Sequence, residues 1–327
     1  MRRQHAFHWS SLALALVLVA VLFTPVFAAN PIGGASAPAP SEGEAGIAQT
    51  SLRPGIYAID YAGIYTNPTD FPFVGTHQSF KWNTLEPVEG VPNWTSLDSF
   101  VRTRAARNVP VSLHISFYDG RSTNPPSSVP DWVYTAVPSA GINCTAGGVT
   151  IKIPKYWDTG FLTKYENFIR RLAEHIRSDP ELNGNIEFIY IGVGRQGETQ
   201  PVDPNWPEDK TCMQNAGLTS AVWVDTVKKI IDIYKRQFKD NGMPQRLLLP
   251  NAPKFLADWE RQEFSLYAIQ NGFGLVPAGV RADLDAVDAR RKAGWHGYYK
   301  YDYLLDQADD MEGRAKPTPA PAYTPFP

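Results

Sequence analysis

The segment IEFIYIGVGRQGE at residues 186–198 constrains the fold of this chain more than any other feature. Residues 186–194 form a near-continuous apolar run rich in β-branched and aromatic side chains. Such a run is typical of a strand buried on both faces, as the strands of parallel sheets are. Glycines then let the backbone turn sharply or approach a ligand closely. A charged group is costly to hold there unless it is paired or used, so Glu198 is the first candidate for chemistry.

Strand-like runs alternate with amphipathic helical patterns along the chain. We predict strands at residues 55–61, 75–82, 109–117, 186–194, 246–250 and 273–283, and helices at residues 97–108, 159–177, 220–238 and 257–270. Strands separated by helices form parallel βα units, which bind ligands at the carboxyl ends of the strands. The sequence therefore predicts an α/β fold with about six recognisable strands, two short of a closed (β/α)8 barrel. Residues 286–313 offer no convincing buried strand, so either the sheet is open or the chain lacks the last quarter of a barrel.

The two ends of the chain differ in composition from its centre. Residues 1–29 combine a short basic head, an apolar core and a small-residue end, which is the layout of a secretory signal peptide. The alternative, a permanent membrane anchor, needs a longer apolar core of about 20 residues. Residues 30–53 are rich in Ala, Pro, Gly and Ser and predict a flexible linker. We therefore expect a secreted or extracytoplasmic protein without a stable membrane span after cleavage, with a folded domain at residues 54–313 and a Pro-rich tail or inter-strand loop at residues 314–327.

Charge and cysteine content narrow the classes of partner. The net charge of −2 and the lack of any Lys/Arg run argue against nucleic acid. Cys144 and Cys212 are the only cysteines of a chain expected to be exported, so a disulfide between them is predicted, with two free buried thiols as the alternative. The cysteines and histidines lack the spacing of metal ligands, and we expect neither a metal nor a cofactor. The sequence leaves the oligomeric state open.

Residues 80–94 read FKWNTLEPVEGVPNW, an aromatic strand end followed by a proline turn and a glycine exit. This string resembles the F-x-W-x-x-L-E-P-x-x-G-x-Y/W signature of clan A glycoside hydrolases, notably the family-42 β-galactosidases and related bacterial barrel proteins. The resemblance extends over residues 55–283. It implies a TIM barrel that acts on O-glycosidic bonds of an oligo- or polysaccharide.

The resemblance also implies roles for individual residues. Glu198 falls at the end of the fourth strand, where clan A enzymes carry the acid/base glutamate, although Gly197 stands in place of their usual asparagine. Glu86 and Glu89 are expected to be structural. The expected substrate-binding residues are Trp82, His114, Trp132, Gln196, Asn251, Arg281 and Asp283.

Retaining glycoside hydrolysis needs two carboxyl groups about 5–5.5 Å apart, one as acid/base and one as nucleophile. Clan A barrels take the nucleophile from the seventh strand, and no such strand is recognisable, so we expect the nucleophile to be absent from this chain. Two hypotheses follow: an exported glycosidase with Glu198 as acid/base, or a non-catalytic carbohydrate-binding or cell-surface module with a degenerate barrel cleft. The alternative role for Glu198 is a salt bridge with Arg195 or Arg281 at a strand end. A lyase or esterase finds no support, since no G-x-S-x-G elbow is present.

Overall fold

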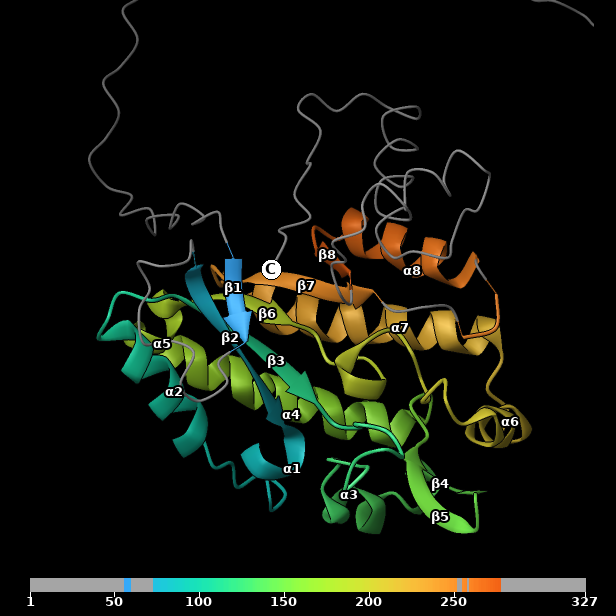
Figure 1. Cartoon of the computed structure of the whole chain (residues 1–327). Helices are drawn as coiled ribbons and strands as arrows, with labels where there is room; N and C mark the ends of the chain where they lie inside the picture. Colours follow the sequence, from blue (N-terminus) through green and yellow to red (C-terminus); the bar gives the residue numbers. More distant parts are fainter. Residues whose placement is uncertain (1–55, 60–72, 252–254, 258, 278–327) are drawn as a thin grey trace, which may run out of the picture. The chain divides into compact units, whose positions relative to one another are not determined.

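A computed structural model describes residues 56–59, 73–251, 255–257 and 259–277 (Figure 1). All of them belong to one compact unit, residues 48–327. The expected signal peptide, the linker, the tail, Arg281 and Asp283 lie outside the described residues. Within the described part of the chain, no helix is both long enough and apolar enough to cross a membrane.

A six-stranded sheet forms the centre of the described structure. Its strands are β1 (Ile56–Ile59), β2 (Phe73–Lys81), β3 (Val111–Ser116), β6 (Ile186–Tyr190), β7 (Arg246–Asn251) and β8 (Gly274–Pro277). Each strand pairs in parallel with the next one in the order β1-β2-β3-β6-β7-β8. The six strands predicted from the sequence are thereby confirmed. A spatial order that follows chain order is that of a barrel sheet, because the order of a doubly wound sheet reverses at a switch point.

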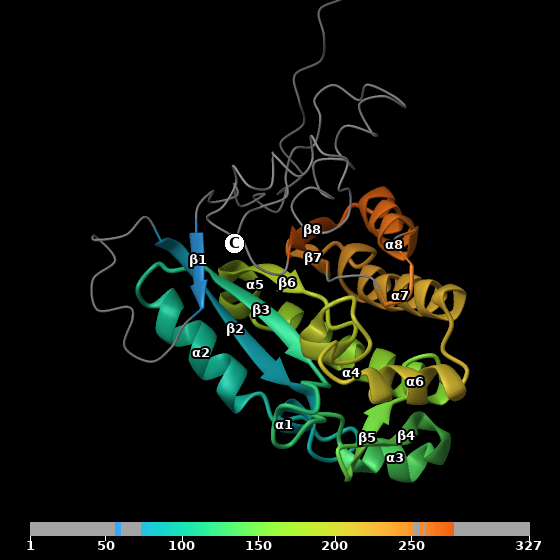
Figure 2. The same ribbon diagram turned by 45° about the vertical axis from the view of Figure 1, so that its right-hand side comes forward.

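Helices connect the strands and cover one face of the sheet (Figures 1 and 2). They are α2 (Thr95–Ala105), α4 (Thr159–Ser178), α5 (Pro180–Asn185), α7 (Ser220–Tyr234) and α8 (Trp259–Gln270), while the short α1 (Trp82–Leu85) directly follows the end of β2. A π-helical turn, Lys235–Lys239, extends α7. The four predicted helices all form. Helix α4 shows why: its apolar residues recur at helical spacing and are buried, and the Asp158 side chain caps its first turn by accepting from the Phe161 amide (3.1 Å).

Apolar side chains pack on both faces of the sheet. Val111, Leu113 and Ile115 of β3 belong to the main core, which the helices complete. A smaller cluster on the opposite face comprises Tyr57, Phe188, Tyr190, Leu248 and Val276, and we call that face the inner face. Because strand side chains alternate, the residues of β3 between its core positions lie on the inner face. Two of these are polar, Ser112 and His114, and each is at least nine-tenths buried.

The loop after β3 contains more structure than the sequence indicated. It holds α3 (Asp131–Ala136) and an antiparallel hairpin of β4 (Gly141–Ala146) and β5 (Val149–Pro154). Gly147 and Gly148 turn the hairpin with φ of +55° and +77°, the signature of a two-residue hairpin turn. A second missed element, α6 (Pro207–Asn215), follows β6. The carboxyl ends of β2 and β3 point toward α1, α3 and this hairpin (Figure 1).

Candidate active site

Glu198 lies on a tight turn beyond the end of β6. The strand ends at Tyr190, earlier than the predicted residue 194, and residues 193–200 fold back on themselves. The Arg195 amide donates to the Gln200 carbonyl (2.6 Å) and the Glu198 amide donates to the Arg195 carbonyl (3.0 Å). Glu198 is half-buried at the exit of this turn.

The turn is attached to both neighbouring strands of the sheet. The Gln196 amide donates to the Tyr118 carbonyl (2.6 Å), just after β3, and the Thr199 amide donates to the Pro250 carbonyl (3.0 Å) in β7. Gln196 is exposed and has a left-handed backbone, with φ of +52°. This conformation costs a non-glycine residue about 1–2 kcal/mol. Backbone strain of this kind is often found at functional sites, where the surrounding contacts maintain it.

His114 lies directly beneath Gly197. A Cβ atom on Gly197 would stand 1.6 Å from His114 Nε2, and Gly197 also has φ of +74°, so both space and backbone require glycine here. His114 is buried, and its Nε2 has no hydrogen-bond partner within the described structure. This burial favours a supporting role under the turn over the direct substrate contact predicted from the sequence.

Two histidines on the inner face are held neutral. Burial, and then the charge of nearby His77, lower the pKa of His114 to about 3, against an opposing effect of Asp119. Burial lowers the pKa of His77 to about 4. His77 Nδ1 shares a hydrogen bond with Ser112 Oγ (3.0 Å), and its ring packs 4.5 Å from that of Tyr190. The imidazolium form of neither histidine is appreciably populated at neutral pH, so neither is a suitable general acid there.

An ion pair that sequence reasoning missed joins the carboxyl ends of β2 and β3. Lys81 Nζ lies 2.9 Å from Asp119 Oδ2, and Asp119 also accepts from the hydroxyls of Ser116 (2.8 Å) and Ser128 (3.1 Å). The sequence could have indicated this pair by position alone, because Lys81 and Asp119 stand at or just after the ends of predicted strands. These charges lie at the edge where parallel strands bind ligands.

Arg195 forms an ion pair with a buried carboxylate. Its guanidinium lies 3.4 Å from Asp203 Oδ2. Asp203 accepts in addition from Ser122 Oγ (3.0 Å) and from the Asn205 amide (3.1 Å). These contacts connect the Glu198 turn to the segment that leads into α6.

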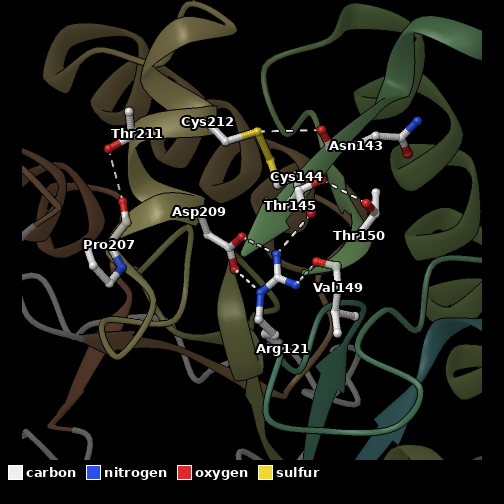
Figure 3. The surroundings of a disulfide bond; sticks show 10 residues. All are labelled: Arg121, Asn143, Cys144, Thr145, Val149, Thr150, Pro207, Asp209, Thr211 and Cys212. Carbon is white, nitrogen blue, oxygen red and sulfur yellow. Dashed lines mark hydrogen bonds and ion pairs between the residues drawn. A yellow bond between two sulfur atoms is a disulfide. The ribbon is translucent and has the colours of Figure 1, made fainter. Parts of the chain in front are cut away.

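A disulfide joins the loops that follow β3 and β6 (Figure 3). Cys144 of β4 is bonded to Cys212 of α6, so the predicted pairing is confirmed. Beside it, Arg121 forms two hydrogen bonds with the fully buried Asp209 (2.5 and 3.1 Å) and donates to the carbonyls of Cys144 and Val149. A buried ion pair with this many hydrogen bonds fixes relative position, and the hairpin and α6 are thereby clamped together.

The expectation that Trp82 lines a sugar cleft is wrong. Trp82 has no exposed surface, donates through Nε1 to Glu86 Oε2 (3.0 Å) and stacks on Phe168 of α4. Phe80, two residues earlier, packs against Phe100 of α2, so this side of β2 faces the helices and not the inner face.

The glutamates of the same motif behave as predicted. Glu86 is fully buried, accepts from the Gly90 amide (2.9 Å) and pairs with Arg171, which is the expected structural role. Glu89 forms an exposed ion pair with Lys164 (2.5 Å).

The remaining candidates fall at different places. Trp132 is half-buried, packs edge-on against Trp82 and donates through Nε1 to the Glu86 carbonyl (3.0 Å). Asn251 ends β7, opposite Pro277 of β8. The structure thus brings His114, Gln196 and Glu198 together at the ends of β3 and β6 and places Trp132 on the helix side. Among the described residues, no group of three or more His, Cys, Asp or Glu side chains is arranged to hold a metal ion.

Comparisons with known proteins support the fold. The catalytic domain of a β-amylase from Paenibacillus polymyxa matches with a TM-score of 0.50 and 10% identity, over 74% of this chain and 76% of that one. A β-galactosidase from the psychrophilic Marinomonas ef1 matches with a TM-score of 0.42 and 11% identity, over 64% of this chain and 37% of that one. A GH10 xylanase from Bispora sp. MEY-1, solved with xylobiose, matches with a TM-score of 0.37 and 14% identity, over 63% of this chain and 53% of that one.

Identities this low bear on the fold alone, and of these three the β-amylase domain carries the argument. It confirms a TIM-barrel fold, of which the described residues supply six strands. No protein-family model and no curated protein matches the sequence.

Proposed function

We propose that this chain is an exported glycoside hydrolase related to the family-42 β-galactosidase-like proteins, with Glu198 as its general acid/base. The observation that carries the proposal is the position of Glu198 after the fourth strand of a barrel sheet, on the edge where barrel enzymes place their catalytic groups. The fold by itself does not imply a function, so the proposal depends on this site. The layout of residues 1–29 and the Cys144–Cys212 bond support export, because disulfides persist in oxidising compartments.

In the proposed mechanism Glu198 protonates the glycosidic oxygen as the bond breaks and later takes a proton from the attacking water. The neighbouring histidines are not in their imidazolium form at neutral pH, so they do not compete as general acids in this step. His114 and Gly197 fix the position of the turn, while the exposed Gln196 side chain is available to contact the sugar. A retaining mechanism also requires a nucleophilic carboxylate about 5–5.5 Å from Glu198, which we assign to no described residue.

The test is the leaving-group dependence of a Glu198→Gln variant of the full-length protein. General acid catalysis contributes about 10²- to 10⁴-fold, so hydrolysis of a substrate with a poor leaving group should fall by that factor. A dinitrophenyl glycoside needs no proton on its leaving group, and its cleavage step should be nearly unaffected. Glu208→Gln, an exposed glutamate in the first turn of α6, is the matched control.

The two substrates separate a catalytic role from a structural one. The quantity to compare is kcat/KM, which reports the bond-cleavage step. An equal loss of kcat/KM on both substrates would indicate that Glu198 only supports the fold, and an unchanged kcat/KM on both would refute the assignment. A full-length protein that binds oligosaccharides without cleaving any aryl glycoside would instead support the non-catalytic module.

A further inference from the structure

A surface depression of about 500 Å³ lies between α1, the loop after β3, α3 and β5. Its volume is in the range of small-molecule sites, about 300–1,000 Å³. We call it the Tyr134 depression. None of its lining residues belongs to the turn that carries Glu198. It is therefore a separate feature of the carboxyl-end loops.

The wall formed by Tyr134 and Lys152 is tightly built. Lys152 Nζ stands 4.7 Å from the centre of the Tyr134 ring, within the distance of a cation–π contact. Both side chains pass close to Gly141, where a Cβ atom would lie 2.8 Å from Lys152 Cδ and 3.0 Å from Tyr134 Cε1. The glycine therefore makes room for this pair. Lys152 is carried by β5, whose partner strand β4 is bonded to α6 through Cys144.

The polar atoms of both aromatic side chains in this depression are already used inside the protein. Trp132 Nε1 donates to the Glu86 carbonyl (3.0 Å), and the Tyr134 hydroxyl shares a hydrogen bond with Ser127 Oγ (3.3 Å). Grooves that bind proline-rich peptides are also lined by aromatic rings, but here Trp132 Nε1 has no further proton to donate to a peptide carbonyl. The two rings and the neighbouring prolines thus offer a ligand mainly apolar surface.

The other lining residues supply polar groups of mixed character. Asn83 can donate and accept, Asp131 accepts and Lys152 donates, so the depression has no net charge. With one carboxylate and one ammonium group the depression offers a polyanion no net attraction, and a lipid chain would leave all three polar groups without partners. A ligand with an apolar face and a rim of neutral hydroxyl groups satisfies the whole set, and sugars have this form.

We propose that the Tyr134 depression is a second carbohydrate-binding site that holds a polysaccharide chain away from the Glu198 turn. The proposal rests on the proposed function for the ligand class, and it requires no catalysis at Glu198. It also gives Trp132 a place in sugar binding that differs from the cleft position expected from the sequence.

Affinity gel electrophoresis of the full-length protein tests this site. The probes are soluble starch, xylan, mixed-linkage β-glucan and galactan, each cast into a native gel at several concentrations. The wild-type protein should be retarded by at least one of them. Tyr134→Ala combined with Lys152→Ala should weaken that retardation at least about fivefold, because aromatic and cationic contacts both disappear. Lys155→Ala is the matched control, since Lys155 also lies over an aromatic ring, that of Trp157, outside the depression.

A second variant guards against misfolding of the first. Asp131→Ala changes an exposed residue at the start of α3 and should weaken retardation while the circular dichroism spectrum stays unchanged. Loss in both variants with retention in Lys155→Ala supports the site. Retardation that survives in both, or a wild-type protein that no probe retards, overturns it.

This test and that of the proposed function fail separately. A protein that cleaves aryl glycosides but is not retarded by any probe would overturn the second site and leave the function standing. Retardation that depends on Lys152 in a protein without any turnover would support the second site and overturn the catalytic function.

Discussion

Substituting Gly197 by alanine probes the packing that fixes the position of Glu198. The new methyl group would meet His114 Nε2 at 1.6 Å, where real contacts are about 3.4 Å or longer, and it would sit on a backbone with φ of +74°. The left-handed backbone costs an alanine about 1–2 kcal/mol. Forcing the turn or the imidazole apart adds about 1–3 kcal/mol, as overpacking does. We expect the free energy of unfolding to fall by about 2–5 kcal/mol.

A control and a double-mutant cycle separate the two costs. Gly242 also has a positive φ, +68°, but nothing lies within 4 Å of its would-be Cβ, so Gly242→Ala should lose only the backbone cost of about 1–2 kcal/mol. Combining Gly197→Ala with His114→Ala removes the steric conflict and leaves the backbone cost. The cycle should therefore show a favourable coupling of about 1–3 kcal/mol.

Urea denaturation followed by circular dichroism and tryptophan fluorescence measures these differences, provided the m-value stays constant among the variants. Our reasoning would be refuted if Gly197→Ala lost no more stability than Gly242→Ala, or if His114→Ala gave no coupling. Either result would mean that His114 does not support the turn from beneath.

Three further predictions concern the groups around this site. Burial lowers the pKa of His77 to about 4 and of His114 to about 3, so between these values and about 6.5 the unfolded chain binds more protons than the folded one. The free energy of unfolding, measured by urea denaturation, should therefore decrease as the pH is lowered through that window, by about 1–2 kcal/mol per histidine at pH 5, unless both are replaced by glutamine. Arg121→Leu leaves the fully buried Asp209 carboxyl without its cationic partner and should lower the free energy of unfolding by about 3–5 kcal/mol, and the Tm with it; an unchanged Tm would show that the pair does not clamp the loops. Cys212→Ser opens a bond that spans 68 residues, and equilibrium unfolding should show a loss of up to about 4 kcal/mol; a loss below 1 kcal/mol would mean that other contacts already hold α6.

The resemblance of residues 80–94 to clan A enzymes was informative about the fold and misleading about one side chain. The motif marks the end of β2 and the buried carboxylate of Glu86, both of which the structure contains. It could not indicate the direction of Trp82, because that direction depends on which face of the sheet the helices cover. Since Phe80 packs against α2, Trp82 follows it into the core. The inner face received Tyr190 and the two neutral histidines instead.

The sequence by itself determined the elements of this protein and their order. Apolar periodicity indicates which residues of a segment are buried, and turn residues mark where a segment ends. The six strands, the four main helices and the position of Glu198 after the fourth strand could therefore be predicted from them. Tertiary structure decided which residues meet. The support of Gly197 by His114, the Lys81–Asp119 ion pair and the Tyr134–Lys152 wall join residues that are 18 to 83 positions apart. Such contacts form only when strand register and loop packing bring the two partners to the same face, and no local sequence pattern indicates which distant residues will be in contact.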